Sequence, residues 1–417
     1  MRYLPRTLDR ELDELLSGAP AIALDGPKGA GKTDTASRRA AQSWFLDSPQ
    51  QRGRLQADFD LRTLAPKGTI LIDEWQRLPQ ILDSVRRRVD AGVQPGRFLL
   101  TGSATPTTAE GTHSGAGRIF SLRMRPMGLH ERGEVQPSVS LGTLLEGGRA
   151  DIGGETEYAL ANYIDAIVTS GFPGALPLSR RMQRSFLESY IVRVIDRDLP
   201  DVGHEVRRPD TLRRWLMAYA AATSTTTAYS RLLDSTSGGD GMQPAKSTTI
   251  AYRDHLTQLF LLDPLPGWTP ARSPMTNLRQ APKHHLADPA LATTLLNLTP
   301  GALLAPHGSS MVGPLFESLV TLGVRVMAQA NDAKVSHLRT KSGDREIDLI
   351  IENIDGRIVA LEVKLSPGID DKDVRHLLWL RDQIPDRVSD LVVISTGAYA
   401  YRRQDGVAVV PLALLGP

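Results

Sequence analysis

The chain has 417 residues, of which 41% are hydrophobic and 23% charged, an average composition that excludes a disordered, collagen-like or coiled-coil protein. At roughly 150 residues per domain, this length predicts two or three domains. A formal net charge of +2 is too small to be a general footprint for nucleic acid, and the lack of cysteine excludes disulfides, thiolate zinc sites and cysteine nucleophiles.

A phosphate-binding motif follows the first predicted strand. The apolar run 20–24 predicts a buried parallel strand. Residues 26–33 then read Gly-Pro-Lys-Gly-Ala-Gly-Lys-Thr, a full G-x-x-x-x-G-K-[ST] match, and a helix is predicted over 34–45. In such a loop the backbone N–H groups point at the β-phosphate. Lys32 would then reach the β- and γ-phosphates, and Thr33 would hold Mg²⁺.

Two further predicted strands, with a helix expected over 79–90 between them, carry polar residues at their carboxyl ends, where ligands of parallel sheets bind. The strand 69–72 ends in Asp73, expected to bind Mg²⁺ through water, and Glu74, expected to polarise the attacking water. A Thr-Gly-Ser sequence follows the strand 97–100, and its Ser103 either senses the γ-phosphate or caps the next segment. The residues predicted to bind ATP are Gly26, Pro27, Lys28, Gly29, Ala30, Gly31, Lys32, Thr33, Asp34, Asp73 and Ser103.

These motifs, in this order, resemble those of the prokaryotic AAA-type ATPases that carry a conserved C-terminal domain of unknown function. The segments that carry the resemblance are 26–33, 70–79, 98–104, 118–127, 171–174, 190–198 and 288–291, so it covers nearly the whole chain. It implies nucleotide binding by the first domain, whereas the cellular role of the family is mostly unassigned. One departure is Trp75, where we expect a smaller apolar residue, and it does not affect the chemistry.

The middle of the chain predicts helices and loops instead of alternating strands. Helices are expected over 156–168, 182–197, 211–222 and 247–262, with a loop over 223–245. The family resemblance implies a winged helix here, which either reads DNA through Lys246, Thr248 and Arg253 or serves as a structural joint. His284 and His285 are adjacent, and on a strand they would point to opposite faces, so we expect no shared metal ion.

The last hundred residues combine carboxylates with a lysine. A helix predicted over 314–327 carries Glu317, and a hairpin is predicted from 345–351 and 357–365 around an Asp-Gly turn. Glu362 and Lys364 share one face of the second strand, and Asp348 lies on its partner strand. Such carboxylates can hold Mg²⁺ or Mn²⁺ against a phosphodiester, while the lysine orients the attacking group.

This arrangement resembles the PD-(D/E)xK nuclease superfamily. Asp348, Glu362 and Lys364 fall on its three signature positions, and Glu317 falls on the helical acid seen in many members. A later helix predicted over 372–383 and a strand over 391–394 agree with this fold. Two interpretations stay open, an active nuclease and a nuclease fold retained as a scaffold.

The sequence therefore predicts an α/β multidomain protein. Its parts are a parallel-sheet P-loop NTPase domain at 1–125, a helical region with a winged helix at 126–305 and an α/β nuclease-like domain at 306–417. The predicted catalytic residues are Lys32, Glu74, Asp348, Glu362 and Lys364, and the predicted metal ligands are Thr33, Asp73, Glu317, Asp348 and Glu362.

The predicted function is ATP hydrolysis coupled to a metal-dependent nuclease-like domain that acts on DNA or RNA, in defence or as a toxin-like component. The alternatives are a nucleotide-gated switch or binding protein with a catalytically silent nuclease fold, and a DNA-dependent motor that forms rings. The sequence leaves open both a homo-oligomer and a protein partner. The N-terminus lacks an apolar signal segment. The apolar runs around 256–262 and 377–380 fall short of the ~20 residues that span a bilayer, so we expect a cytoplasmic protein without a membrane partner.

Overall fold

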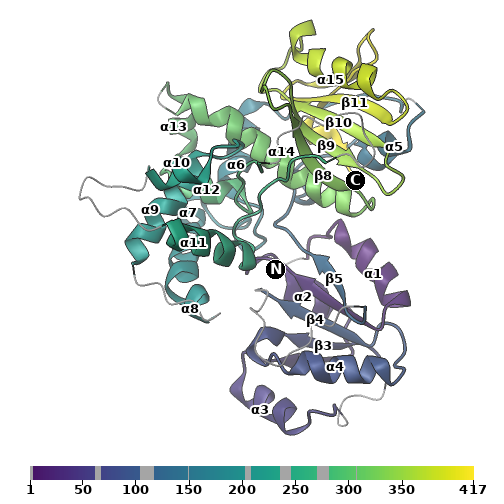
Figure 1. Ribbon diagram of the computed structural model, residues 1–417, viewed down its shortest axis with the longest axis vertical. Coiled ribbons are helices and arrows are strands. Elements are labelled where there is room, and N and C mark those ends of the chain that lie inside the picture. The colour runs from purple at the N-terminus through teal and green to yellow at the C-terminus, as the bar shows by residue number, and fades with distance from the viewer. Residues whose placement is uncertain are drawn as a thin grey trace.

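The computed structural model describes residues 3–61, 67–103, 117–148, 150–201, 208–234, 246–269, 281–306 and 308–417. Figure 1 shows an N-terminal α/β part, a group of helices from the middle of the chain, and a second sheet formed mainly by the last hundred residues. The fold is thus α/β and contains a parallel sheet, as predicted.

The N-terminal part is a five-stranded parallel sheet of order β2-β3-β4-β1-β5. Its elements are α1 (Leu8–Gly18), β1 (Ala21–Asp25), α2 (Lys32–Ser37), β2 (Gln42–Phe45), α3 (Pro49–Ala57), β3 (Ile70–Asp73), a 3-10 turn (Trp75–Arg77), α4 (Ile81–Asp90), β4 (Phe98–Gly102) and β5 (Phe120–Arg123). Successive strand residues point to opposite faces. Ile72 and Leu100 therefore pack with α3 and α4, whereas Leu71 and Leu99 pack with α1 and α2.

The helix predicted over 34–45 is wrong in its second half. Helix α2 ends at Ser37, and β2 begins at Gln42. Strand β2 forms an edge of the sheet, where Trp44 pairs with Ile72 of β3. Pairing with β3 and the aromatic side chains of this segment favour a strand, and this tertiary contact outweighs the helix propensity of the preceding alanines and arginines.

The middle region is helical. Its elements are α6 (Leu160–Thr169), α7 (Arg180–Arg193), a π-helical segment (Val194–Asp198), α8 (Leu199–Asp201), α9 (Pro209–Ala221), α10 (Tyr229–Asp234), α11 (Lys246–Gln258), α12 (Pro289–Leu295) and α13 (Pro300–Leu304). The predicted helices are present with shifted ends, whereas the loop predicted over 223–245 contains α10 in its described part. After α11, antiparallel bridges join Leu262 to Leu286 and Leu265 to Lys283.

The C-terminal part is a seven-stranded mixed sheet of order β7-β12-β13-β11-β10-β9-β8. Its later elements are α14 (Val312–Gln329), β8 (Lys334–Arg339), β9 (Glu346–Glu352), β10 (Ile358–Val363), α15 (Asp371–Gln383), β11 (Val388–Ser395), β12 (Tyr399–Arg402), β13 (Ala408–Pro411) and β14 (Leu415–Gly416). The predicted hairpin is present, because β9 and β10 are antiparallel and pair Leu349 with Leu361.

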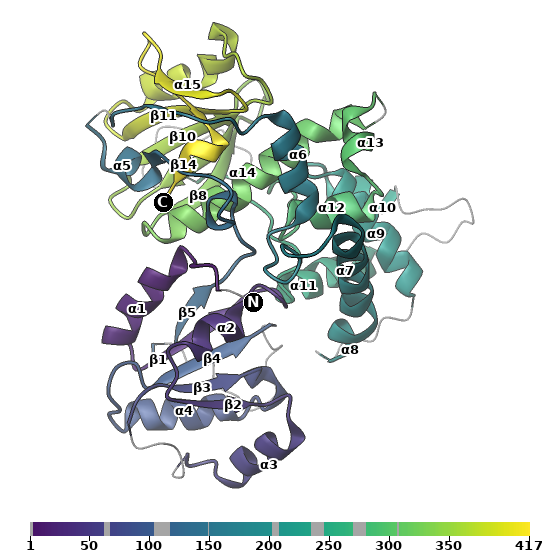
Figure 2. The ribbon, with the colours of Figure 1, turned by 180° about the vertical axis from the view of Figure 1, so that it is seen from behind.

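A segment that precedes the middle helices adds β7 to this sheet and forms a separate two-stranded sheet with β14. It contains β6 (Val139–Ser140), α5 (Leu141–Glu146) and β7 (Gly154–Glu155). Strand β7 pairs with β12, β6 pairs with β14, and α5 packs against β10 and β11 (Figure 2). The chain therefore contributes a strand to the C-terminal sheet before it forms the middle region.

Helix α14 is a core element. Within the described residues, Ser309–Gln329 is the one helix long and apolar enough to cross a membrane, but 72% of its apolar window is buried inside the protein. Leu315, Phe316 and Leu319 are fully buried and belong to the largest apolar core, which joins the middle helices to the C-terminal sheet. A helix that is apolar on most sides is expected in such a core.

A buried ion cluster lies where the three parts meet. Asp263, which follows α11, forms ion pairs with Arg123 of β5 (3.2 Å), Arg125 (2.8 Å) and Arg325 of α14 (3.0 Å). Burial by itself raises the pKa of Asp263, but the three guanidinium groups outweigh burial and hold this pKa well below its ordinary value. The cluster ties the N-terminal sheet to the other two parts.

Candidate functional site

The phosphate-binding loop connects β1 to α2 at the carboxyl end of the sheet, where the sequence places it. Gly29 and Gly31 have φ angles of 76° and 101°, in the left-handed region that favours glycine. A Cβ atom on Gly26 would lie 2.0 Å from the carbonyl oxygen of Met124. The glycines of the motif are therefore required by the shape of the loop and by its close contact with the segment after β5.

Lys32 lies beneath this loop. Its Nζ donates hydrogen bonds to the carbonyl oxygens of Gly26 (2.7 Å) and Pro27 (2.9 Å). Burial lowers the pKa of Lys32 to about 8, against the attraction of nearby carboxylates that include Glu74 and Asp25. The ammonium is held next to the loop by two carbonyl contacts that a phosphate oxygen could replace.

The structure brings Thr33 and Asp73 together. The hydroxyl of Thr33 donates to Oδ1 of Asp73 at 2.8 Å, and the hydroxyl of Thr101 donates to the same oxygen. Both oxygens are hard donors of the kind that Mg²⁺ prefers. Thr33 and Asp73 therefore fit a magnesium ion, with Thr33 as a direct ligand and Asp73 in contact through a water molecule.

Glu74 lies one residue beyond β3 and lines the pocket described below. Its φ of 55° is uncommon for a residue other than glycine. Its carboxylate accepts hydrogen bonds from the amide of Gln76 (2.5 Å) and the hydroxyl of Ser103 (3.3 Å), and these two side chains also contact each other at 3.1 Å. Ser103 thus lies beside Glu74, and Gln76 is a member of this group that the sequence reasoning missed.

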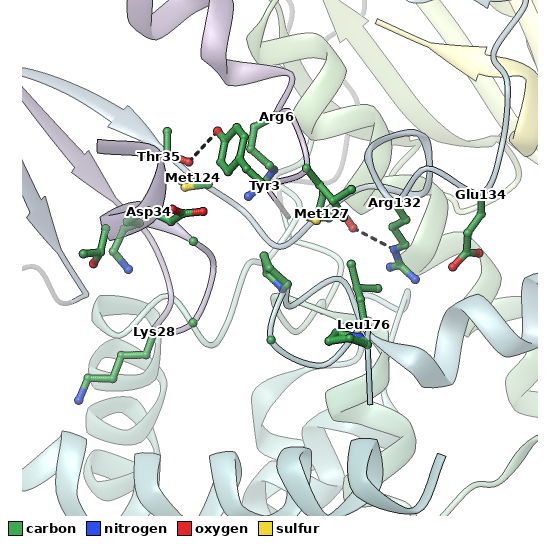
Figure 3. Close-up of a pocket in the computed structure, with 18 of the residues that line it drawn as sticks. Tyr3, Arg6, Lys28, Asp34, Thr35, Met124, Met127, Arg132, Glu134 and Leu176 are labelled. Atoms are coloured by element: carbon green, nitrogen blue, oxygen red, sulfur yellow. Dashed lines mark hydrogen bonds between the residues drawn. The ribbon is translucent and has the colours of Figure 1, made fainter. Parts of the chain in front are cut away.

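A cavity of about 690 Å³ opens over the loop (Figure 3). Its polar side contains Lys28, Lys32, Thr33, Asp34 and Glu74, and its other side contains Tyr3, Leu4, Met124, Met127, Arg132, Glu134 and the segment 173–177. Arg132 and Glu134 lie across the cavity from Asp34 and Thr35. The polar part fits phosphates and the apolar part fits a base, so the cavity has the composition that a nucleotide requires.

An ion pair and a hydrogen bond connect the loop to other segments. Lys28 forms an ion pair with Asp198 of the π-helical segment, and Arg6 donates to the carbonyl oxygen of Ala30 at 2.8 Å. Arg6 also forms a buried ion pair with Glu131 at 3.3 Å. Among the pocket residues, the Nη2 atom of Arg132 is buried without a hydrogen-bond partner among the described residues.

The C-terminal carboxylates surround a lysine that the sequence reasoning did not single out. Lys283 Nζ lies 2.9 Å from Glu317 of α14, 2.9 Å from Asp348 of β9 and 3.1 Å from Glu346 of β9. We call these three carboxylates the acidic cluster. Burial opposes the charge of Lys283, but the cluster outweighs burial and raises the pKa of Lys283 well above its ordinary value.

The remaining two predicted residues pair with each other. Lys364 donates to Oε1 of Glu362 at 2.8 Å, whereas Oε2 of Glu362 is buried with no partner in the described structure. Burial, and next the charge of Asp348, raise the pKa of Glu362 to about 8. The other oxygen of Asp348 accepts the backbone N–H of Val363 at 2.9 Å. In the described part of the chain, no group of three or more His, Cys, Asp or Glu side chains has a metal-binding arrangement.

Comparison with known families identifies the first domain. Residues 18–132 match the family described as "AAA domain". Residues 160–302 and 312–415 match two families that are each described as a domain of unknown function. Residues 18–132, which contain the loop and the Thr33–Asp73 contact, therefore form an AAA-type P-loop domain. This assignment supports ATP binding and hydrolysis. The resemblance to AAA-type ATPases with a C-terminal domain of unknown function agrees with these matches.

Similar proteins are known from mycobacteria. Uncharacterized proteins of Mycobacterium bovis and Mycobacterium tuberculosis are each 27% identical over 414 residues, which is 96% of this chain and 82% of theirs. Among solved structures, a Walker-type ATPase of Pyrococcus abyssi is similar over 69% of this chain and 94% of its own, with 16% identity and a TM-score of 0.42.

Several contributors to the nucleotide pocket lie outside the AAA domain's own motifs. Pro173, Gly174, Leu176 and Pro177 come from the middle region, and Tyr3 comes from the N-terminus. Asp198, which pairs with Lys28 of the pocket, also belongs to the middle region. The Gly-Phe-Pro-Gly sequence at 171–174 is one of the segments that carry the family resemblance, but the motif alone does not predict that it lines the pocket. An ion pair such as Lys28 with Asp198 leaves no local sequence pattern.

Proposed function

We propose that this protein is an ATP-hydrolysing switch whose AAA domain signals its nucleotide state to the middle region. The single observation that carries the proposal is the 2.8 Å contact between Thr33 and Asp73, at the polar side of a nucleotide-sized cavity. These two residues belong to different strand–loop units, and they converge where Mg²⁺ and the β- and γ-phosphates are required.

Each polar residue of the AAA domain has a role in this proposal. Lys32 exchanges its carbonyl partners for oxygens of the β- and γ-phosphates, while Thr33 and Asp73 hold the metal ion. When bound, Mg²⁺ neutralises charge on the transferred phosphoryl group. Glu74 orients and deprotonates the attacking water, and Ser103 and Gln76 fix its carboxylate.

The proposed signal passes through the far side of the cavity. The segment 173–177 lines the same cavity as the loop, so a bound nucleotide would touch both the AAA domain and the middle region. Lys28 is shared in a similar way, because its ammonium can pair either with Asp198 or with a phosphate. Exchange between these partners would change how firmly the π-helical segment is held.

The test is ATP turnover together with nucleotide binding. Lys32→Ala is expected to lower turnover by about 100-fold or more and to weaken ATP binding, because phosphate contacts are lost. Glu74→Gln is expected to lower turnover by about 100-fold while ATP binding is retained, because only the general base is removed. Lys67→Ala, at an exposed position, is the matched control. Full turnover in both site variants would contradict the proposal.

A metal-dependent nuclease is the second candidate function. It is favoured by the antiparallel register of β9 and β10, which brings Asp348 close to Glu362, and by the neighbouring Lys364 and Glu317. Divalent-metal-dependent cleavage of DNA or RNA that disappears with Asp348→Ala would support it. The ion pairs that Lys283 forms with Glu317 and Asp348 weigh against it.

Nucleic acid is a proposed partner of the middle region. Helices α9, α10 and α11 are followed by the antiparallel bridges 262–286 and 265–283, an order that supports a winged helix. Arg253, however, stacks on Tyr229 and pairs with Asp254, and the side chain of Lys246 lies outside the described residues. A role in defence, a cytoplasmic location, and a homo-oligomer or protein partner remain predictions.

A further inference from the structure

The acidic cluster receives its cation from another part of the chain. Lys283 lies on the bridge with Leu265, where each residue donates its N–H to the carbonyl oxygen of the other at 2.9 Å. Its side chain is 1% exposed and its three carboxylate partners lie within 3.1 Å. The ammonium of Lys283 donates hydrogen bonds to Glu317 and Asp348 and forms an ion pair with Glu346, so three carboxylates surround its charge.

The segment that delivers Lys283 is fixed to the C-terminal sheet. The N–H of Trp268 donates to the carbonyl oxygen of His337 on β8 (2.7 Å), and the N–H of His337 donates to that of Pro266 (2.9 Å). The indole N–H of Trp268 donates to Glu352 at 2.7 Å. Lys283 therefore reaches the cluster from a backbone held at the edge of the sheet.

A divalent metal does not fit beside this ammonium. Glu317 and Asp348, two of the three metal ligands predicted in the C-terminal domain, each direct an oxygen at Lys283 Nζ. The second oxygen of Asp348 is engaged by a backbone N–H, and one oxygen of Glu362 by Lys364. A metal ion would have to displace this buried ammonium from its carboxylates, or stay beside it against strong repulsion between the two cations.

We propose that Lys283 is a built-in cation that takes the place of the divalent metal in the acidic cluster of this chain. The C-terminal domain then needs no metal, and its carboxylates fasten the middle region to the sheet instead of holding a catalytic ion. This inference does not depend on ATP hydrolysis by the AAA domain, so either can fail alone.

The first test is Mn²⁺ binding to the nucleotide-free full chain, measured by the electron paramagnetic resonance signal of free Mn²⁺. The wild type and Asp348→Asn are expected to give the same titration curve, because Asp348 holds no metal. A manganese site in the wild type that Asp348→Asn removes would overturn the proposal. This comparison does not require any variant at Lys283.

The second test opens the site. Lys283→Ala removes the ammonium and leaves space among three carboxylates, so it is expected to gain an Mn²⁺ site about tenfold or more tighter than any in the wild type. Asp348→Asn in the same background is expected to remove that site. Mn²⁺ should also raise the thermal midpoint of Lys283→Ala and leave that of the wild type unchanged. A folded Lys283→Ala chain without such a site would overturn the proposal.

A comparison of thermal midpoints tests whether Lys283 fastens the middle region to the C-terminal sheet. Lys283→Met is expected to lower the thermal midpoint much more than Lys364→Met, a matched control that removes a lysine with 30% side-chain exposure from a single carboxylate. Adding Glu317→Gln to Lys283→Met is expected to restore part of the midpoint, because it removes one of the repelling charges. Equal midpoints for the two lysine variants would contradict the fastening role.

Discussion

The ammonium of Lys28, in the phosphate-binding loop, forms an ion pair with Asp198 of the middle region, 170 residues later in the sequence. This contact joins the part of the molecule that would meet a phosphate to a π-helical segment between α7 and α8. Such segments are often found at functional positions in helices. The pair thus connects the phosphate-binding loop directly to the middle region.

Loss of this ion pair is expected to uncouple the two parts with little change in stability. In Lys28→Met, ATP should no longer change the amide hydrogen exchange of residues 194–201, whereas in the wild type it should. Because the side chain of Lys28 is 38% exposed, the free energy of unfolding should change by only about 0–1 kcal/mol. Asp198→Asn should give the same result. An unaltered exchange response in both variants would rule out this connection.

Ser103 and Gln76 are expected to act through Glu74. Ser103→Ala and Gln76→Ala each remove one hydrogen bond to its carboxylate, so the turnover of ATP should fall by about three- to tenfold, the value of a bond worth roughly 1 kcal/mol. The Kd for ATP should stay unchanged. In a Glu74→Gln background the same substitutions should have no further effect, and an additive loss would show that they act by another route.

Asp263 is expected to be essential for the stability of the junction. Asp263→Asn leaves the guanidinium groups of Arg123, Arg125 and Arg325 without their shared charge, so the free energy of unfolding should fall by about 3–5 kcal/mol. Asp254→Asn is the matched control, because its ion pair with Arg253 is half exposed, and it should cost less than about 1 kcal/mol. Denaturant unfolding of the three proteins measures both values.

Stability is expected to fall in mild acid because of buried histidines beside Lys283. Burial, and next the charge of Lys283, lower the pKa of His337 from 6.5 to about 4, and burial also lowers the pKa of His284 and His285. The unfolded chain binds these protons more tightly than the folded chain. The stability is therefore fully present above about pH 6.5 and is lost as the pH falls toward 4.

Each such histidine contributes up to about 1.4 kcal/mol per pH unit within its window. His337→Gln is expected to reduce the slope of unfolding free energy between pH 6.5 and 4 by about that amount. The more exposed His376, with a smaller contribution expected, provides the control substitution His376→Gln. An unchanged slope in His337→Gln would show that His337 does not cause the acid sensitivity.

The histidine pair also shows what sequence spacing can decide. His284 contacts the carbonyl oxygen of Thr227, whereas His285 contacts the hydroxyl of Ser318. The two imidazoles therefore have separate partners, as expected of adjacent residues in an extended segment. Alternation along an extended chain is a local property, and it can be predicted without knowledge of the fold.

The sequence by itself determined those structural elements whose geometry depends on residues close to one another in the chain. The glycine loop between β1 and α2, the acidic end of β3 and the β9–β10 hairpin all lie where their motifs predict, because backbone hydrogen bonds and glycine conformations fix them over short distances. The AAA domain and its candidate residues could therefore be identified from these motifs alone.

Only the tertiary structure decided what surrounds those residues. Lys283 enters the acidic cluster from 65 residues before Asp348, and the segment 173–177 completes the nucleotide cavity from the middle region. Neither position belongs to a periodic pattern, since one buried charge requires one complementary partner that can come from anywhere in the chain. The carboxylates thus predicted a metal site, whereas the packing of the domains supplied an ammonium.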